Sequence, residues 1–258
     1  VAWCWKAGNG TTINNDGTIQ STTSVNSDAG FSIVSYTGNA TTGATFGHGL
    51  SQRPDFVAIK QRTDASNSNW LVWHQSLTGH SYYLHFDTTG KQETNTAFFT
   101  DFGASTITLG NANHTNGNGD ELIAYCWHGV EGFSKFGKYD ANTNDNGPFV
   151  HLGFRPAFVM LKTFSGTSNG NYWAWTIYDN KRITTNPVHT PLYANHNVAE
   201  GYRGDGSTSS GGNILYVDFL SNGFKLRNGG TEGNPNVAGD DVLYVAYAEM
   251  PFKYANAR

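Results

Sequence analysis

The chain has 258 residues, enough for one large domain or two small ones. Its 16 Lys and Arg against 20 Asp and Glu give a net charge of −4, so it lacks the clustered positive charge that nucleic-acid binding needs. Charged residues make up only 14% of the chain and aromatic residues another 14%, alongside 31 Gly. Few helix formers and many strand and turn formers predict an all-β protein. No apolar run approaches about 18 residues, so no membrane insertion is expected.

Residues 1–30 are predicted to be a strand followed by a linker. Residues 1–5 (VAWCW) have the pattern of a strand, and residues 2–5 match AYCW at 124–127. They therefore resemble the last strand of an earlier copy, which predicts that the chain is a piece of a longer protein. Residues 8–30 are rich in Gly, Asn, Thr and Ser, a composition typical of a loop.

The rest of the chain reads as short strands separated by turns. Regular spacing with turn residues between the strands favours a sandwich or jelly roll over a parallel sheet, and no amphipathic helix is evident. The expected strands are 55–61, 70–74, 106–109 and 122–127 in one half, and 157–163, 172–176, 223–226 and 242–248 in the other.

These two halves repeat one another. RPDFVAIK at 53–60 matches RPAFVMLK at 155–162, an offset of 102, and NWLVW at 69–73 matches NYWAW at 171–175 at the same offset. DF at 101–102 matches DF at 218–219, an offset of 117, and LIAY at 122–125 matches YVAY at 244–247, an offset of 122. An internal duplication is therefore predicted. It gives a β-sandwich unit over 31–130 and a second over 131–258, with Pro54 overlaying Pro156 and Trp73 overlaying Trp175.

Longer phrases carry a resemblance to a known family. They include GFSKFG (132–137), GFRPAFVMLK (153–162), DNKR (179–182), DFLSNGFKLR (218–227) and VAYAEMPF (245–252). The chain resembles a domain of unknown function found in virion proteins of marine tailed phages, especially cyanophages. That resemblance implies a tail fibre or another appendage on the virion surface, and it implies no catalytic residues.

Aromatic side chains supply the first candidate binding residues. Side chains alternate between faces along a strand, so Leu71 and Trp73 share one face, and Trp70 and His74 share the other. Because the Leu71 and Trp73 face is apolar in both halves, we assign it to the core. Trp70, His74 and Tyr172 are then candidates for a surface that binds sugars, whose apolar C–H faces stack on aromatic rings. The alternative is that each ring simply packs in the fold.

Histidine and tyrosine clusters supply the others. They lie in two stretches of the chain, and none has the spacing of a metal site with acidic or Cys partners. The alternative is again structural, with polar loop residues that make hydrogen bonds. The full set of predicted ligand-binding residues is Trp70, His74, His80, Tyr82, His85, Tyr172, Tyr193, His196 and Tyr202.

Signals for catalysis, cofactors and metals are weak. The sequence has no G-x-S-x-G, H-E-x-x-H or P-loop motif, and its sparse acids lie mostly in turns. The Asn-rich stretch 140–147 departs from an EF-hand loop, because Asp145 stands where Gly is needed. A calcium site of another kind stays open there. We expect no enzyme, no cofactor and no metal, and two unpaired buried thiols at Cys4 and Cys126.

The sequence thus predicts a virion appendage module that binds host-surface carbohydrate without chemistry, as a homo-oligomer. One alternative is a purely structural virion protein, a capsid decoration or fibre spacer that contacts only other virion proteins. Another is a polysaccharide-degrading tailspike domain, which would need two carboxylates facing a cleft.

Overall fold

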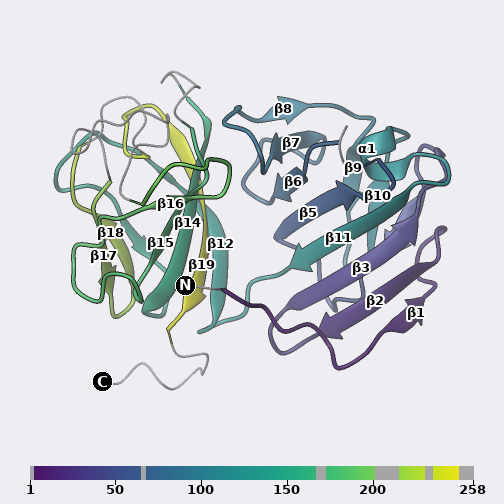
Figure 1. Ribbon diagram of the computed structural model, residues 1–258, viewed down its shortest axis with the longest axis horizontal. Coiled ribbons are helices and arrows are strands. Elements are labelled where there is room, and N and C mark those ends of the chain that lie inside the picture. Colours follow the sequence, from purple (N-terminus) through teal and green to yellow (C-terminus); the bar gives the residue numbers. More distant parts are fainter. Residues whose placement is uncertain (1–2, 65–67, 167–172, 201–214, 230–234, 250–258) are drawn as a thin grey trace. The chain divides into compact units, whose positions relative to one another are not determined.

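The protein is described here from a computed structural model, for residues 3–64, 68–166, 173–200, 215–229 and 235–249. The expectation of an all-β protein is confirmed (Figure 1). Within these residues the α-helical structure is a single turn, α1 (Asn113–Asn116). No helix in this part of the chain is long and apolar enough to cross a bilayer.

The chain divides into two compact units. The N-terminal unit comprises Ala2–Phe86 and Gln92–Val130. The C-terminal unit comprises Glu131–Arg258 together with Val1 and the short segment Asp87–Lys91. The predicted repeats 31–130 and 131–258 fall one in each unit, whereas the segment at 87–91 departs from that simple division.

The N-terminal unit contains a large and a small antiparallel sheet. The large sheet extends from edge strand β1 to edge strand β8 (Figure 1). The large sheet has the order β1 (Thr12–Asn14), β2 (Ser21–Asn26), β3 (Phe31–Thr37), β11 (Glu121–Trp127), β5 (Phe56–Gln61), β6 (Leu71–His74), β7 (Tyr82–His85) and β8 (Glu93–Thr94). The small sheet has the order β4 (Thr45–Gly47), β10 (Thr106–Leu109) and β9 (Phe99–Phe102).

The C-terminal unit has the same kind of construction. Its larger sheet has the order β12 (Ser134–Asp140), β19 (Asp241–Ala248), β14 (Pro156–Ser165), β15 (Thr176–Asp179) and β16 (Leu192–Tyr193). Its small sheet has the order β13 (Phe149–His151), β18 (Gly223–Leu226) and β17 (Val217–Leu220). All of these pairings are antiparallel.

The strand orders of the two units correspond. When strands are matched by their order along the chain, the spatial order β3-β11-β5-β6-β7 is the same as β12-β19-β14-β15-β16. The order β4-β10-β9 is likewise the same as β13-β18-β17. The small sheets also keep the predicted offset of 117, because Asp101 pairs with Thr108 and Asp218 pairs with Lys225. Strands β1 and β2 have no counterpart among the described residues of the C-terminal unit.

Strand register corrects two predicted equivalences. Trp127 pairs with Phe56 and Tyr247 pairs with Phe158, so residues 122–125 correspond to 242–245 rather than to 244–247, and the predicted offset of 122 is wrong by two residues. The second correction concerns Trp73. With Phe56 matched to Phe158, the partner of Val57 is Trp73 and the partner of Val159 is Tyr178. Trp73 therefore corresponds to Tyr178 rather than to Trp175. Both Trp73 and Tyr178 are buried. If the register of β14 and β15 is continued by one residue, Trp175 stands opposite Lys162. Trp70 occupies the corresponding position in the N-terminal unit.

The following turn supports this corrected register. Gln75 N donates to Asp55 O in the N-terminal unit, and Asn180 N donates to Ala157 O in the C-terminal unit. The alignment of NWLVW with NYWAW is thus wrong by three residues. An odd shift moves every side chain to the other face of the sheet, so the assignment of Trp175 to the core-facing side of its strand is also wrong.

Each unit buries one core between its sheets. Phe46, Phe99, Ile107, Leu71 and Trp73 are at most 2% exposed in the N-terminal unit. Trp73 stacks on Phe102 with ring centroids 3.8 Å apart. In the C-terminal unit the core joins both sheets through residues that include Val159, Leu161, Tyr178, Phe219, Phe224 and Tyr244. Alternating inward positions on facing strands explain why short strands suffice to bury this core.

The first 30 residues differ from the prediction. The described part of the expected opening strand, from Trp3 to Trp5, has no strand, and Cys4 is exposed whereas Cys126 is buried. The expected linker instead contains β1 and β2. The strand β2, with the sequence STTSVN, pairs with β3 along six residues, and Ser21 Oγ donates to Gly47 O at 2.8 Å. The composition that indicates a loop is here compatible with an added hairpin.

Candidate functional site

Trp70 and His74 do share one face of the large sheet, opposite the core, but only Trp70 reaches solvent. Trp70 is half-buried and lies 5.9 Å from the ring of Tyr125. His74 is 0% exposed, and its Nδ1 accepts a hydrogen bond from Ser76 N. The expectation that His74 belongs to an open surface is therefore wrong, because its imidazole is held inside the unit by the turn that follows β6.

The other predicted residues of the N-terminal unit are half-buried and dispersed. His80 Nδ1 lies 3.0 Å from Asp101 Oδ1, and its ring contacts those of Trp73 and Phe102 at 5.9 and 5.7 Å. Tyr82 and His85 occupy the two ends of β7, where the His85 ring meets Tyr83 edge to face at 5.3 Å. Val72 pairs with Leu84 and Leu71 pairs with His85, so Tyr82 lies on the sheet face of Trp70 and His85 lies on the opposite face.

The predicted residues of the C-terminal unit are only partly described. Tyr193 and His196 are half-buried, with ring centroids 6.3 Å apart. The strand register matches Tyr193 with His85, since Leu71 pairs with His85 and Thr176 pairs with Tyr193. Tyr172 and Tyr202 lie outside the described residues.

A larger group of rings surrounds Trp70. On the face of the large sheet opposite the core, β3, β5 and β11 contribute Phe31, Phe56, Tyr125 and Trp127. The Trp127 ring stacks on Phe31 at 4.8 Å and contacts Phe56 at 5.2 Å and Tyr125 at 6.2 Å. Trp5 meets Trp127 edge to face at 6.4 Å. We call these six residues the aromatic platform: Trp5, Phe31, Phe56, Trp70, Tyr125 and Trp127.

The aromatic platform is partly open to solvent. Trp5 is 37% exposed, Trp70, Tyr125 and Trp127 are half-buried, and Phe31 and Phe56 are buried. Sequence reasoning found Trp70 but missed the others, although Tyr125 and Trp127 are two residues apart on one predicted strand. That spacing sets both rings on the same face and is the signal that could have found them.

Polar groups lie at the margins of the aromatic platform. Lys60 is half-buried on the same face, and its Nζ donates to Ser68 O. Asp55 precedes β5, its backbone N donates to Trp127 O at 2.7 Å, and its carboxylate accepts from Gly129 N at 2.6 Å. Burial raises the pKa of the Asp55 carboxyl, and the Gly129 N–H opposes that change. One acid and one base therefore flank the rings.

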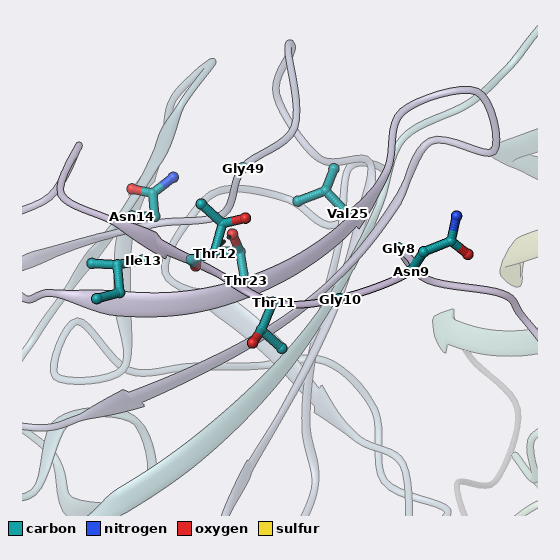
Figure 2. A pocket seen from close by; sticks show the side chains of 10 residues that line it. All are labelled: Gly8, Asn9, Gly10, Thr11, Thr12, Ile13, Asn14, Thr23, Val25 and Gly49. Carbon is teal, nitrogen blue, oxygen red and sulfur yellow. Dashed lines mark hydrogen bonds between the residues drawn. The ribbon is translucent and has the colours of Figure 1, made fainter.

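A separate groove of about 440 Å³ follows edge strand β1 (Figure 2). Its walls are Gly8, Asn9, Gly10, Thr11, Thr12, Ile13, Asn14, Thr23, Val25 and Gly49. These residues offer hydroxyl, amide and backbone groups but neither a ring nor an ionisable side chain. The groove therefore provides no stacking surface of the kind that the aromatic platform has.

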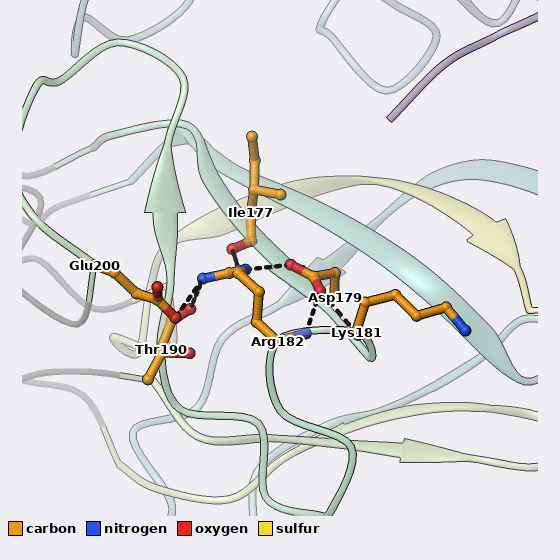
Figure 3. A network of polar contacts seen from close by, with 6 residues as sticks. All are labelled: Ile177, Asp179, Lys181, Arg182, Thr190 and Glu200. Carbon is orange, nitrogen blue, oxygen red and sulfur yellow. Dashed lines mark hydrogen bonds and ion pairs between the residues drawn. The ribbon is translucent and has the colours of Figure 1, made fainter. Parts of the chain in front are cut away.

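A buried ion pair in the C-terminal unit accounts for the DNKR phrase (Figure 3). Asp179 is fully buried, Arg182 Nε lies 2.5 Å from its Oδ2, and Arg182 NH1 donates to Thr190 O and Glu200 Oε1. Burial would raise the pKa of the Asp179 carboxyl, but the Arg182 N–H, its guanidinium and the Lys181 N–H outweigh burial and hold that pKa below its usual range. This network fixes the turn after β15, a structural role.

The family comparison covers nearly the whole chain. Residues 1–251 match the family model described as Domain of unknown function (DUF7483). The chain belongs to this family. No curated protein and no solved structure matches it. The DUF7483 match therefore shows the family of the chain but assigns no activity to it.

The described residues of this DUF7483 domain contain no group of three His, Cys, Asp or Glu side chains placed to hold a metal ion. What the aromatic platform offers is a set of ring faces at the surface of a rigid sheet. Such faces bind apolar C–H surfaces by dispersion, while flanking polar groups orient the ligand.

Proposed function

We propose that this DUF7483 domain is a non-enzymatic module of a phage virion appendage, such as a tail fibre, that binds host-surface carbohydrate through the aromatic platform. The observation that carries this proposal is the group of six rings in mutual contact on one sheet face, with Trp5 37% exposed. Contiguous aromatic surface of this kind is characteristic of binding sites. The resemblance to marine phage virion proteins supplies the biological setting.

We further propose that the two units arose by duplication. Their matching strand orders and the matched turns after β6 and β15 support this. In the C-terminal unit, the positions that correspond to Phe31, Tyr125 and Trp127 hold Ser134, Val245 and Tyr247. The rings of Phe31 and Tyr125 are thus specific to one copy. Phe56, Trp70 and Trp127 have the counterparts Phe158, Trp175 and Tyr247, which are also aromatic.

Appendage modules work as homo-oligomers because repeated weak sites raise avidity without new contacts. A single aromatic platform should bind a glycan with a Kd on the order of 0.1–1 mM. An oligomer should then bind host cells far better than a monomer.

The test is a glycan array followed by a cell-binding assay with fluorescent protein, as monomer and as oligomer. Trp70→Ala and Tyr125→Ala should each reduce binding while the circular dichroism spectrum stays native. Ile13→Ala, at an exposed residue away from the rings, is the matched control. Binding that the two ring variants leave unchanged would refute the aromatic platform as the site.

The second candidate is a purely structural virion protein, favoured by the repeated architecture, which suits a spacer. If the oligomer binds no host cell or glycan better than the monomer does, this candidate replaces the first. The expected ligand is then another virion protein that covers the same rings.

A further inference from the structure

A second surface with ligand-binding chemistry lies on the outer face of the small sheet in the C-terminal unit. Val150, Phe224, Val217 and Phe219 point into the core, so the alternate residues of β13, β18 and β17 point outward. Phe149 and Tyr216 are the two exposed rings there, at 44% and 41% exposure. We call this surface the outer β13 face: Phe149, His151, Lys225, Arg227, Tyr216 and His189.

Register places these side chains in adjoining rows. Phe149 pairs with Lys225, and Lys225 pairs with Asp218. In the next row, Arg227 N donates to Tyr216 O at 2.8 Å. Because neighbouring strands are about 4.8 Å apart, β13 and β17 are roughly 10 Å apart across β18. The two rings therefore stand on opposite sides of a basic strip formed by Lys225 and Arg227.

A histidine ring lies next to each of the two exposed aromatic rings. His151 meets Phe149 edge to face at 6.5 Å, and His189 meets Tyr216 edge to face at 5.7 Å. Both imidazoles are exposed. The bridge between Val188 and Val217 places His189 directly beside β17, so it belongs to the same surface.

The charge of the outer β13 face is positive, although the chain as a whole carries −4. Its cations are Lys225, which also donates to Gly147 O, and Arg227, whose Nε lies 3.0 Å from Asp218 Oδ2. Lys135 adds a third cation at the edge, where its Nζ donates to His151 O. Asp218 is the acid within the rows, and Asp145, bonded to Gly229 N, lies near the end of β18.

The corresponding sheet of the N-terminal unit shows that the fold does not need this chemistry. There the row is Thr45, Thr108 and Asp101 in place of Phe149, Lys225 and Asp218. Thr45 is occupied by hydrogen bonds with Thr18. The acid is present in both units, as Asp101 and Asp218. The ring of Phe149 and the cation of Lys225 occur only in the C-terminal unit.

We propose that the outer β13 face binds an acidic saccharide, with the rings stacked on sugar C–H faces and Lys225 and Arg227 paired with sugar carboxylates. Positive charge between two exposed rings complements a ligand that is at once apolar-faced and anionic. This inference rests on the proposed function in that the ligand is a carbohydrate, but it uses different residues in the other unit.

The experiment is calorimetric titration of the full chain with a galacturonate hexasaccharide, and with a galactose hexasaccharide as the neutral match. The acidic probe should bind more tightly, and its affinity should fall as salt rises. Lys225→Met and Arg227→Met should each weaken it about three- to fivefold, the effect of one exposed charge pair. Lys181→Met, at an exposed lysine in the turn after β15, should leave affinity unchanged.

Phe149→Ala and Tyr216→Ala should weaken both probes, because ring stacking does not depend on ligand charge. Absent binding of the acidic probe, or equal affinities for Lys225→Met and Lys181→Met, would overturn the proposal. So would a hexaglutamate peptide that binds as tightly, since the surface would then recognise acidic protein. Loss of cell binding in Trp70→Ala reports on the aromatic platform alone, so the two proposals fail separately.

Discussion

Lys60 and Lys162 occupy corresponding places in the two units, and their surroundings differ. Lys60 is half-buried, and its Nζ donates to Ser68 O. Lys162 is 0% exposed, and its Nζ lies within hydrogen-bond distance of the carbonyls of Thr89, Gly90, Thr163 and Trp173. Burial lowers the pKa of the Lys162 ammonium to about 7.

The same contrast holds for rings on the sheet face that carries each lysine. Trp70 and Trp127 are half-buried on the face of Lys60, whereas their counterparts Trp175 and Tyr247 are 0% and 7% exposed. One of the two sheet faces is therefore part of the protein interior, and the other keeps ring surface accessible. The same strand order can thus enclose the rings in one unit and leave them partly exposed in the other.

The largest expected effect is on the stability of the C-terminal unit. Trp175→Ala should lower its free energy of unfolding by about 3–5 kcal/mol, because a fully buried ring leaves a cavity. Denaturant unfolding followed by tryptophan fluorescence measures it. A loss below about 1 kcal/mol would show that this face is not interior and would remove the contrast with Trp70.

Lys162→Met should cost about 2–4 kcal/mol, because methionine keeps the volume but leaves buried carbonyl groups without a donor. Lys60→Met should cost less than about 1 kcal/mol, since Lys60 is half-buried and water can replace its Nζ as the donor to Ser68 O. Equal losses in the two variants, measured by denaturant unfolding, would show that the two lysines do not differ in function.

The pH dependence of stability gives a further check on Lys162. Its pKa is about 7 in the folded state and near 10.4 in an unfolded chain, so the unfolded state binds more protons between these values. Stability of the native protein should therefore rise with pH from about 7 to 9.5, relative to Lys162→Met. Below about pH 7 this contribution should be flat. Thermal unfolding of both proteins across this range is the measurement, and parallel curves would contradict the expectation.

Trp70→Ala should have the smallest effect on stability among the tryptophan variants, about 1 kcal/mol, because the ring is only half-buried. Its thermal shift should be clearly smaller than that of Trp175→Ala in the same buffer. A shift of equal size would mean that Trp70 is part of the packing rather than of a binding surface.

Much of the fold could be predicted because the signals were local. Pro54 and Pro156, the strand-forming runs after them and the paired Asp-Phe motifs identify corresponding strands, and the small sheets keep the predicted offset. The slip at Trp73 and Trp175 arose because the three-residue spacing of Trp70 and Trp73 occurs twice in the other half, from Tyr172 to Trp175 and from Trp175 to Tyr178. Such a pattern fits more than one register when no pairing partner is known.

The candidate site was harder to predict because it depends on neighbours across the sheet. Nothing local to Trp70 shows that Tyr125 stands beside it, since the two come together through the pairing of β6 with β5 and of β5 with β11. The prediction that His74 is exposed was wrong for a related reason. Its strand alternates as expected, but the turn that follows encloses the imidazole, and alternation alone does not report what covers a face.

The segment Asp87–Lys91 bears on how this protein can be divided for study or recombined in evolution. It lies between two strands of the N-terminal unit, β7 and β8, yet belongs to the C-terminal unit, where Thr89 and Gly90 supply carbonyls to Lys162. A cassette cut at residues 130 and 131 would carry Lys162 without these acceptors. Gene fusions or truncations that transfer the C-terminal unit alone should therefore yield a less stable product than the full chain, unless Lys162 is replaced at the same time.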